Sequence, residues 1–496
     1  MSLFRKKDLT AMLAQAEDGG KGLKRTLGAG NLIALGVGAI IGAGLFVRTA
    51  AAAGQAAGPA VTLSFIVAAI GCAFAGLCYA EFAAMIPISG SAYAYSYVTM
   101  GETVAWIIGW ALIMEYALGA ATVSIAWSEY LNKLLGHTIP YEWSHSPFES
   151  LTDTAGVVHH GIMNAPALVI LLLLTLLLIK GTQESAIVNA IIVFIKVAIV
   201  LLFIFIGWKF INPANHTPYM IPADQAPVVD ASGKVIADYS GVFKHGWGGV
   251  LGGAAIVFFA FIGFDAVSTA AQEAKNPKRD MPIGILGSLV VCTILYILFG
   301  HVLTGVANWK DFVDPLKGRE ASVAYAISTY MTGYGWLATA VTVAILAGFS
   351  SVILVMLMGQ SRVFFSMAND GLLPSVFSDL HPKYRTPYKS NWILFVFVGA
   401  FAAFVPGSVA GDLTSFGTLF AFVLVSAGVW ILRKKSPEME RPFKTPLVPL
   451  VPILGAVICL AMIFALDAQT LKVAFAWMAI GLVVYFVYSR KHSKLN

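Results

Sequence analysis

The sequence predicts an all-α protein whose helices cross a membrane many times. Of its 496 residues, 58% are hydrophobic and only 12% are charged, and the mean hydropathy is +0.79. A helix needs roughly 20 mainly apolar residues to cross the hydrocarbon core of a bilayer. Twelve stretches are this long or nearly so, and they predict twelve transmembrane helices near residues 29–50, 60–84, 96–129, 163–180, 186–208, 247–271, 283–305, 334–362, 391–406, 412–432, 449–467 and 471–489.

Both ends of the chain are predicted to lie in the cytoplasm. The first 25 residues are polar and contain no apolar stretch like that of a signal peptide, so we interpret residues 1–28 as a cytoplasmic N-terminal leader. If the N-terminus is cytoplasmic and the chain crosses the membrane twelve times, 22 of the 32 Lys and Arg residues lie on the cytoplasmic side. The positive-inside rule expects such an excess. This bias accounts for most of the net charge of +6. We therefore expect a multi-pass protein of the plasma membrane, with no nucleic-acid partner.

The spans divide into two blocks and an appendage. A first five-helix repeat would cover residues 29–208, a second 247–432, and two additional C-terminal helices 449–489. Because each block has an odd number of spans, the second would insert upside down. The first span of each block is rich in glycine, at residues 36–47 (GVGAIIGAGLFV) and 248–277. Glycine-interrupted spans at matching positions of two halves point to the binding site of a transporter.

These glycines allow two interpretations. Small residues let helices pack closely, which is their common role in membranes. Residues 41–44 (IGAG), however, have almost no side-chain bulk, and unwinding there would free N–H groups suited to a carboxylate and carbonyls suited to an ammonium. Residues 259–263 could break in the same way. Irregular backbone at this depth is tolerated where it lines a cavity, so two facing breaks would bind both ends of an α-amino acid with main-chain atoms.

Five motifs follow one another along the chain: GAIIGAGLF, YAEFAAMIPISGSAYAY, FIGFDAVSTAAQEAKNPKRDMP, SRVFFSMANDGLLP and LHPKYRTP. In sequence and order they resemble motifs of the amino acid–polyamine–organocation superfamily, and of its bacterial cationic amino acid transporter branch in particular. The resemblance covers roughly residues 25–435. It implies the LeuT fold, with twelve transmembrane helices, a 5+5 inverted repeat, broken first and sixth helices, and alternating access.

The resemblance also implies roles for the residues at the two breaks. The substrate carboxylate would meet the amides of Ala43 and Gly44, and Phe259 would be the aromatic inner gate. The substrate amino group would meet main-chain carbonyls of both helices. The full predicted substrate-binding set is Ile40, Ile41, Gly42, Ala43, Gly44, Glu115, Phe259, Ala260 and Ile262.

Lys196 is predicted to couple transport to protons. It lies in the middle of the fifth span among apolar neighbours, where a charge costs from about 2.5 to more than 10 kcal/mol and marks a functional residue. Snorkelling to the membrane surface is the alternative, but the lysine is too deep to reach water easily. Removal from water favours the neutral form of a lysine. The resemblance implies that its ammonium takes the place of the sodium ion of sodium-coupled relatives, contacting Gly42 and Ser350 or Ser351.

Three acidic residues in or near the spans are further candidates. Glu115, in the third span, could neutralise a cationic substrate side chain, pair with Lys196, carry the proton itself, or be a neutral hydrogen-bonding group. The third helix lines the distal substrate pocket in the implied fold, which favours the first role. Asp265 follows the second break and could hold the inner half of the sixth helix. Glu273 lies near the membrane surface and is predicted to belong to an ion network at the inner gate.

The predicted function is secondary active transport, in which L-amino acids enter by proton symport. The expected substrates are cationic (arginine, lysine or ornithine) and small neutral amino acids. An exchanger, or a non-transporting amino acid sensor on the same fold, is the alternative. No nucleotide-binding loop, nucleophile elbow or H-E-x-x-H motif occurs, and the four cysteines fall within spans. We therefore expect no enzymatic activity, no metal and no cofactor besides the coupling proton; the expected partners are the amino acid and the lipid bilayer, and an accessory subunit stays unspecified.

Overall fold

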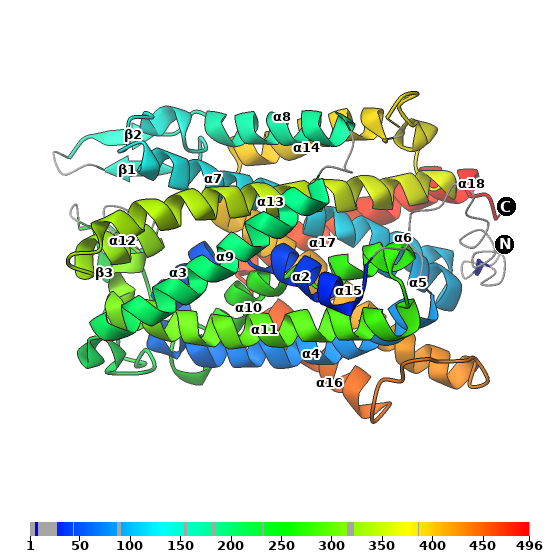
Figure 1. Ribbon diagram of the computed structural model, residues 1–496, viewed down its shortest axis with the longest axis horizontal. Coiled ribbons are helices and arrows are strands. Elements are labelled where there is room, and N and C mark those ends of the chain that lie inside the picture. The colour runs from blue at the N-terminus through cyan, green and yellow to red at the C-terminus, as the bar shows by residue number, and fades with distance from the viewer. Residues whose placement is uncertain are drawn as a thin grey trace.

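The protein is an elongated bundle of helices that run mostly along its long axis (Figure 1). The structure, a computed structural model, describes residues 5–7, 27–42, 44–86, 91–152, 156–180, 185–230, 233–314, 322–384 and 386–495. Within these residues, eight helical segments are long and apolar enough to cross a membrane, and four shorter apolar helices have 10–17 residues. The shorter ones are α2 (Ala29–Ile40), α8 (Ala165–Lys180), α14 (Tyr388–Phe404) and α16 (Leu450–Phe464).

In the described residues up to α9, the regular elements are helices and one hairpin. Helix α6 continues through a π-helical turn (Met114–Leu118) into α7, so the two form one long segment. Strands β1 and β2 pair antiparallel. After α2, the helices and strands are α3 (Thr49–Ala52), α4 (Val61–Met85), α5 (Ser91–Thr99), α6 (Glu102–Ile113), α7 (Gly119–Leu134), β1 (Ser150–Thr152), β2 (Val158–His160), α8 and α9 (Ser185–Gly207).

The second half has the same character, with a second antiparallel hairpin of β3 and β4 before its first long helix. Both hairpins lie at one end of the bundle and both chain termini at the other (Figure 1). The remaining elements are β3 (Val228–Val229), β4 (Val235–Ala237), α10 (Gly246–Val257), α11 (Pro277–Val306), α12 (Ser322–Tyr330), α13 (Gly335–Asn369), α14, α15 (Gly407–Lys435), α16, α17 (Ala468–Val484) and α18 (Arg490–His492).

Local sequence sets several of these boundaries. Pro277 occupies the first turn of α11, where its missing N–H costs no helical hydrogen bond. The side chain of Asp467 accepts a hydrogen bond from the backbone of Gln469 and caps α17. Gly101 separates α5 from α6 with a φ of +101°, a conformation that favours glycine.

Four helices form the part of the bundle that positions the candidate site. Helix α11 packs along both α2 and α4, and α10 packs against α4. Helix α9 contacts α2, α11 and α13. The first helix of each predicted repeat is thus held by different neighbours: α2 packs against α9, α11 and α13, and α10 packs against α4.

Charged side chains tie the helices together at the end that carries the termini. Glu81 of α4, only 1% exposed, accepts two hydrogen bonds of 2.9 Å from Arg433 at the end of α15, and Arg441 lies 3.3 Å from the same carboxylate. Lys7 pairs with Asp370, just after α13, at 2.7 Å. A buried bidentate arginine–carboxylate pair is geometrically specific, so this end is held by defined contacts between distant parts of the chain.

Candidate functional site

The first candidate helix is interrupted where the sequence predicts. Helix α2 ends at Ile40, Ile41 has extended backbone (φ −73°, ψ 108°), and helical structure resumes at Gly44. The carbonyl of Gly42 accepts the N–H of Leu45 at 3.1 Å. Ala43 lies outside the described residues, so the role expected of its amide stays a prediction.

The second candidate helix is interrupted in the corresponding place. Helix α10 ends at Val257 and passes into a 3₁₀ turn, Phe258–Phe261. Ile262 is then extended (φ −60°, ψ 133°), and Gly263 has a φ of +115°, which an L side chain rarely adopts. A further 3₁₀ segment, Asp265–Glu273, follows. The glycine is what allows the chain to turn sharply inside the bundle.

The two interruptions pack directly against one another. A Cβ atom on Gly44 would overlap the backbone of Ala260. A Cβ on Gly263 would come 2.9 Å from the carbonyl carbon and oxygen of Ala39, closer than side chains tolerate. The glycines thus let two irregular backbones meet, and the described members of the predicted binding set around this contact are all buried: Ile40, Ile41, Gly42, Gly44, Phe259, Ala260 and Ile262.

Tyr296 of α11 connects the two interruptions and was not predicted. Its hydroxyl donates to the carbonyl of Ile40 at 3.0 Å and to that of Ala260 at 2.9 Å, sharing one proton between them. Both carbonyls belong to the set expected to receive the substrate amino group. A buried tyrosine hydroxyl generally finds a polar partner. A tyrosine inside an apolar span is therefore the sequence feature that could have identified Tyr296 as a candidate.

Removing the Tyr296 hydroxyl is expected to destabilise the substrate-free protein. In Tyr296→Phe, two buried carbonyls lose a donor, which costs about 1–3 kcal/mol. The midpoint of thermal unfolding in detergent should fall accordingly. Saturating amino acid should narrow the difference from the wild type, because its ammonium would supply the missing donor.

Tyr79→Phe is the matched control for this prediction. Tyr79 is fully buried, but its hydroxyl has no hydrogen-bond partner among the described residues, so its removal should not lower the midpoint. Equal midpoints for Tyr296→Phe and the wild type would contradict the role of Tyr296.

Lys196 of α9 contacts the first interruption. Its ammonium donates to the carbonyls of Gly38 at 2.7 Å and Ile41 at 3.0 Å, and the residue is 1% exposed, which excludes snorkelling in this conformation. These carbonyls belong to the last turn and the cap of α2, the helix end that carries partial negative charge and favours a cation. Gly348 of α13 leaves room for the lysine stem, since a Cβ there would lie 2.8 Å from its Cδ.

These two hydrogen bonds place the ammonium beside the end of α2. The predicted contacts of Lys196 with Gly42 and with Ser350 or Ser351 stay predictions. The hydroxyl of Ser350 donates to the carbonyl of Leu346 at 2.9 Å within its own helix. Ser351 is buried on the same helix, α13.

Glu115 lies in the π-helical turn between α6 and α7 and is fully buried. Its carboxyl group lies close to that of Asp265. Asp265 also accepts a hydrogen bond of 2.8 Å from the hydroxyl of Tyr116, so it joins the second interrupted helix to the third predicted span. Two adjacent buried carboxyl groups repel one another when both are ionised, so their proximity costs free energy unless a positive group or a proton is near.

The structure corrects one possible role of Glu115. Both hydrogen bonds of the Lys196 ammonium go to α2, so within the described residues Glu115 and Lys196 form no ion pair in this conformation. The side chain of Glu273 lies outside the described residues, and its predicted place in a gate network stays a prediction.

The buried, interrupted helices and the multi-pass architecture define a membrane permease. The family model described as amino acid permease matches residues 27–488, and the chain belongs to that family. The predicted resemblance to the amino acid–polyamine–organocation superfamily is thereby confirmed.

The chain is similar over its whole length to named bacterial transporters. It is 44% identical to the branched-chain amino acid permease BcaP of Bacillus subtilis (strain 168), over 100% of this chain and 99% of that protein. It is 41% identical to the methylthioribose transporter of the same organism, with the same coverage. It is also 33% identical to the vacuolar cationic amino acid transporter 4 of Arabidopsis thaliana, over 88% of this chain and 68% of that protein.

Proposed function

We propose that the protein imports L-amino acids by proton symport, through alternating access of a LeuT-type fold with twelve spans and two inverted repeats, 29–208 and 247–432. The observation that carries the proposal is the direct contact of the two interrupted helices through Gly44 and Ala260. Unpaired main-chain groups are tolerated at this depth only beside a cavity or a partner, and a zwitterion offers partners of both kinds. In this proposal both chain termini are cytoplasmic.

The shared part of the substrate is recognised by the main chain. The carboxylate meets the amides of Ala43 and Gly44 at the start of the outer half-helix, which carries partial positive charge. The ammonium meets the carbonyls of Ile40, Phe259, Ala260 and Ile262. The carbonyl oxygens of Ile40 and Ala260 each accept the hydroxyl of Tyr296. Because a carbonyl oxygen has two lone pairs, each can also accept a hydrogen bond from the substrate ammonium.

Proton coupling acts through Lys196. The protonated ammonium stabilises the end of α2 through the carbonyls of Gly38 and Ile41. A neutral amine is a weaker donor and does not neutralise the negative end of the helix. Loss of the proton therefore releases α2 next to the substrate site, so that proton movement and helix rearrangement are linked.

The substrate side chain is recognised by Glu115. Its buried carboxyl group lies beside that of Asp265, so a cationic side chain of arginine, lysine or ornithine would find acidic acceptors there. A branched-chain amino acid is the second candidate, favoured by the relatives named branched-chain amino acid permease, at 44% and 32% identity.

Glu115→Gln is expected to weaken arginine and lysine more than alanine. Loss of a charged hydrogen-bonding partner costs roughly 1–3 kcal/mol, or about 5- to 150-fold in affinity. Alanine has no cationic side chain, so its affinity does not depend on the charge of Glu115. Inhibition constants of the three amino acids against one labelled substrate measure the effect. An equal loss for arginine, lysine and alanine would rule out this specificity role and favour the branched-chain candidate.

Uptake into proteoliposomes tests the function itself. With an inward proton gradient, labelled L-amino acid should accumulate in a saturable and stereoselective manner, and a collapsed gradient should abolish accumulation. Competition by all twenty amino acids at two pH values identifies the substrates. Exchange that ignores the gradient would identify an exchanger, and binding without accumulation would identify a sensor.

A further inference from the structure

Two short segments from opposite ends of the sequence meet at the end of the bundle that carries the chain termini. Figure 1 shows α18, α5 and α6 at this end. Residues 493–495, here called the tail segment, follow α18, and residues 5–7, the leading segment, precede α2 in the sequence. Both segments contact Glu102, the first residue of α6, and Asp370, which follows α13. These two acidic residues therefore form a common attachment point.

Glu102 binds the tail segment through its side chain and the leading segment through its backbone. The residue is 4% exposed, and its carboxylate accepts hydrogen bonds from the hydroxyls of Tyr97 and Tyr485, each at 3.1 Å, and of Ser493. The backbone N–H of Glu102 donates to the carbonyl of Arg5 at 2.8 Å. A buried carboxylate is costly without hydrogen-bond donors, so the hydroxyl of Ser493 has a clear partner in the bundle.

Asp370 also binds both segments. One oxygen of its carboxylate accepts the ammonium of Lys7 at 2.7 Å, and the other accepts the hydroxyl of Tyr93 of α5 at 2.8 Å. The backbone carbonyl of Asp370 accepts the N–H of Lys494 at 3.1 Å. The leading segment is thus held by the side chain of Asp370 and the tail segment by its main chain.

The two segments also touch one another, and the backbone before the tail segment lies tightly on the bundle. The guanidinium of Arg5 donates to the carbonyl of Leu495 at 2.8 Å. The N–H of Leu495 donates to the hydroxyl of Ser493 at 3.2 Å, which fixes the shape of the tail segment. Gly371 has a φ of +81°, and a Cβ there would lie 2.2 Å from the carbonyl oxygen of His492. The absence of a side chain at Gly371 is what allows this approach.

We propose that Glu102, Asp370 and Gly371 form a binding site for the tail segment, which acts as an intramolecular latch that slows opening of the cytoplasmic end. The inference rests on the proposed alternating access, in which this end is cytoplasmic and must open to release substrate. While the tail segment is bound, it holds Arg5 and, with it, the chain that leads to α2. Its release leaves the leading segment with fewer contacts to α6 and α13, so the end opens more readily.

A latch and a purely structural tail predict opposite changes in rate. A tail that only stabilises the fold would lower both stability and transport when it is removed. A latch stabilises the closed cytoplasmic end relative to the open one, so its removal should make transport faster. The sign of the change therefore distinguishes the two roles.

Counterflow of labelled amino acid in proteoliposomes tests the latch. Ser493→Ala, and a variant that lacks residues 493–496, should each raise the maximal rate about fivefold, the order of one hydrogen bond to a charged group. Ser489→Ala is the matched control, because Ser489 is also buried but its hydroxyl has no hydrogen-bond partner among the described residues. This control should transport at the rate of the wild type.

A peptide added in trans tests whether the attachment point is a binding site. The peptide SRKHSKLN, which corresponds to residues 489–496, should return the variant that lacks residues 493–496 to the wild-type rate when present on both sides of the membrane. The peptide SRKHAKLN has the same charge but no hydroxyl at the position of Ser493, and should have at most a small effect. Equal slowing by both peptides would show that their charge acts without recognition, and would overturn the site.

Hydrogen exchange of the purified protein gives a measurement that does not depend on transport. The N–H of Lys7 donates to the carbonyl of Tyr97 at 3.4 Å, and that of Glu102 to Arg5, so both amides report on the leading segment. Their exchange should be about fivefold faster in Ser493→Ala than in the wild type. If wild-type counterflow is measurable but Ser493→Ala leaves the rate unchanged or lowers it, the latch is overturned while transport stands. Absence of wild-type counterflow would instead overturn the proposed function, and unchanged exchange would then still overturn the hold on the leading segment.

Discussion

Lys196→Met is expected to abolish uptake driven by a proton gradient while substrate exchange partly survives. Methionine fills much of the volume of the lysine stem but has no ammonium for the carbonyls of Gly38 and Ile41. It also cannot take up or release a proton. The variant should therefore lose the link between proton movement and the end of α2, but retain the main-chain site that binds the amino acid.

Proteoliposomes with and without an imposed gradient measure this effect. Gradient-driven accumulation should fall to the background of empty liposomes, and counterflow of labelled against unlabelled substrate should remain detectable. Lys180→Met is the control, because Lys180 is exposed at the end of α8 and should behave as the wild type. An unchanged dependence of Lys196→Met uptake on the proton gradient would refute the coupling role.

Gly44→Val is expected to eliminate substrate binding. The added side chain would overlap the backbone of Ala260, and the two interruptions would have to move apart. Overpacking of this kind costs about 1–3 kcal/mol of stability. The loss of affinity should be larger, at least about 100-fold or 3 kcal/mol, because the carboxylate and ammonium sites would no longer face one another.

Equilibrium binding to the purified, monodisperse variant distinguishes this effect from misfolding. Gly30→Ala, in the helix α2 that precedes the first interruption, is the matched control, because a Cβ at Gly30 meets no atom within 4 Å. Alanine also favours a helix over glycine by about 1 kcal/mol, so this control should bind and transport normally. Normal affinity in Gly44→Val would show that the contact of the two interruptions is not the substrate site.

The interruptions were predictable because glycine content is a local property of the sequence. Residues 41–44 and 259–263 lack bulk or contain a glycine at the turn, and the helices end at Ile40 and Val257. The partners of Lys196 depend instead on where α2 ends, which fixes the carbonyls that are free. The hydrogen bonds of Lys196 to Gly38 and Ile41 could not be predicted, because a local pattern does not fix a helix end to the residue.

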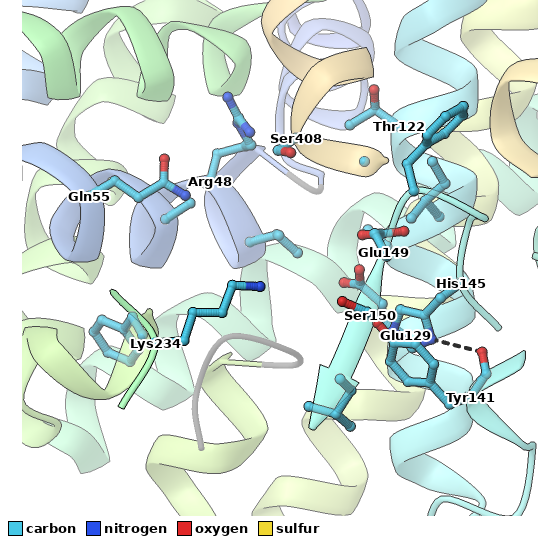
Figure 2. Close-up of a pocket in the computed structure, with 18 residues that line it drawn as sticks. Arg48, Gln55, Thr122, Glu129, Tyr141, His145, Glu149, Ser150, Lys234 and Ser408 are labelled. Carbon is cyan, nitrogen blue, oxygen red and sulfur yellow. Dashed lines mark hydrogen bonds between the residues drawn. The ribbon is translucent and has the colours of Figure 1, made fainter. Parts of the chain in front are cut away.

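The remaining features depend on how distant helices cross. Glu115 and Asp265 are brought together by the arrangement of α6, α7 and the second interruption, and no local pattern pairs them. Tyr296 was overlooked because an apolar span containing one tyrosine is common in membrane proteins. The charged cavity of Figure 2 is lined by residues of both hairpin regions and of α7 and α15, and loops of this kind carry too little periodicity to be placed from sequence.

The hydroxyl of Tyr296 has a mechanical consequence for transport. One hydroxyl donates to the carbonyl of Ile40 at the end of α2 and to that of Ala260 in the 3₁₀ turn after α10, so these two segments cannot separate without breaking a hydrogen bond. Helix α11 packs along α2 and α4, and α4 packs along α10, so in the proposed alternating access we expect these four helices to move as one rigid unit. The substrate would then move together with these four helices, and the remaining helices would stay in place.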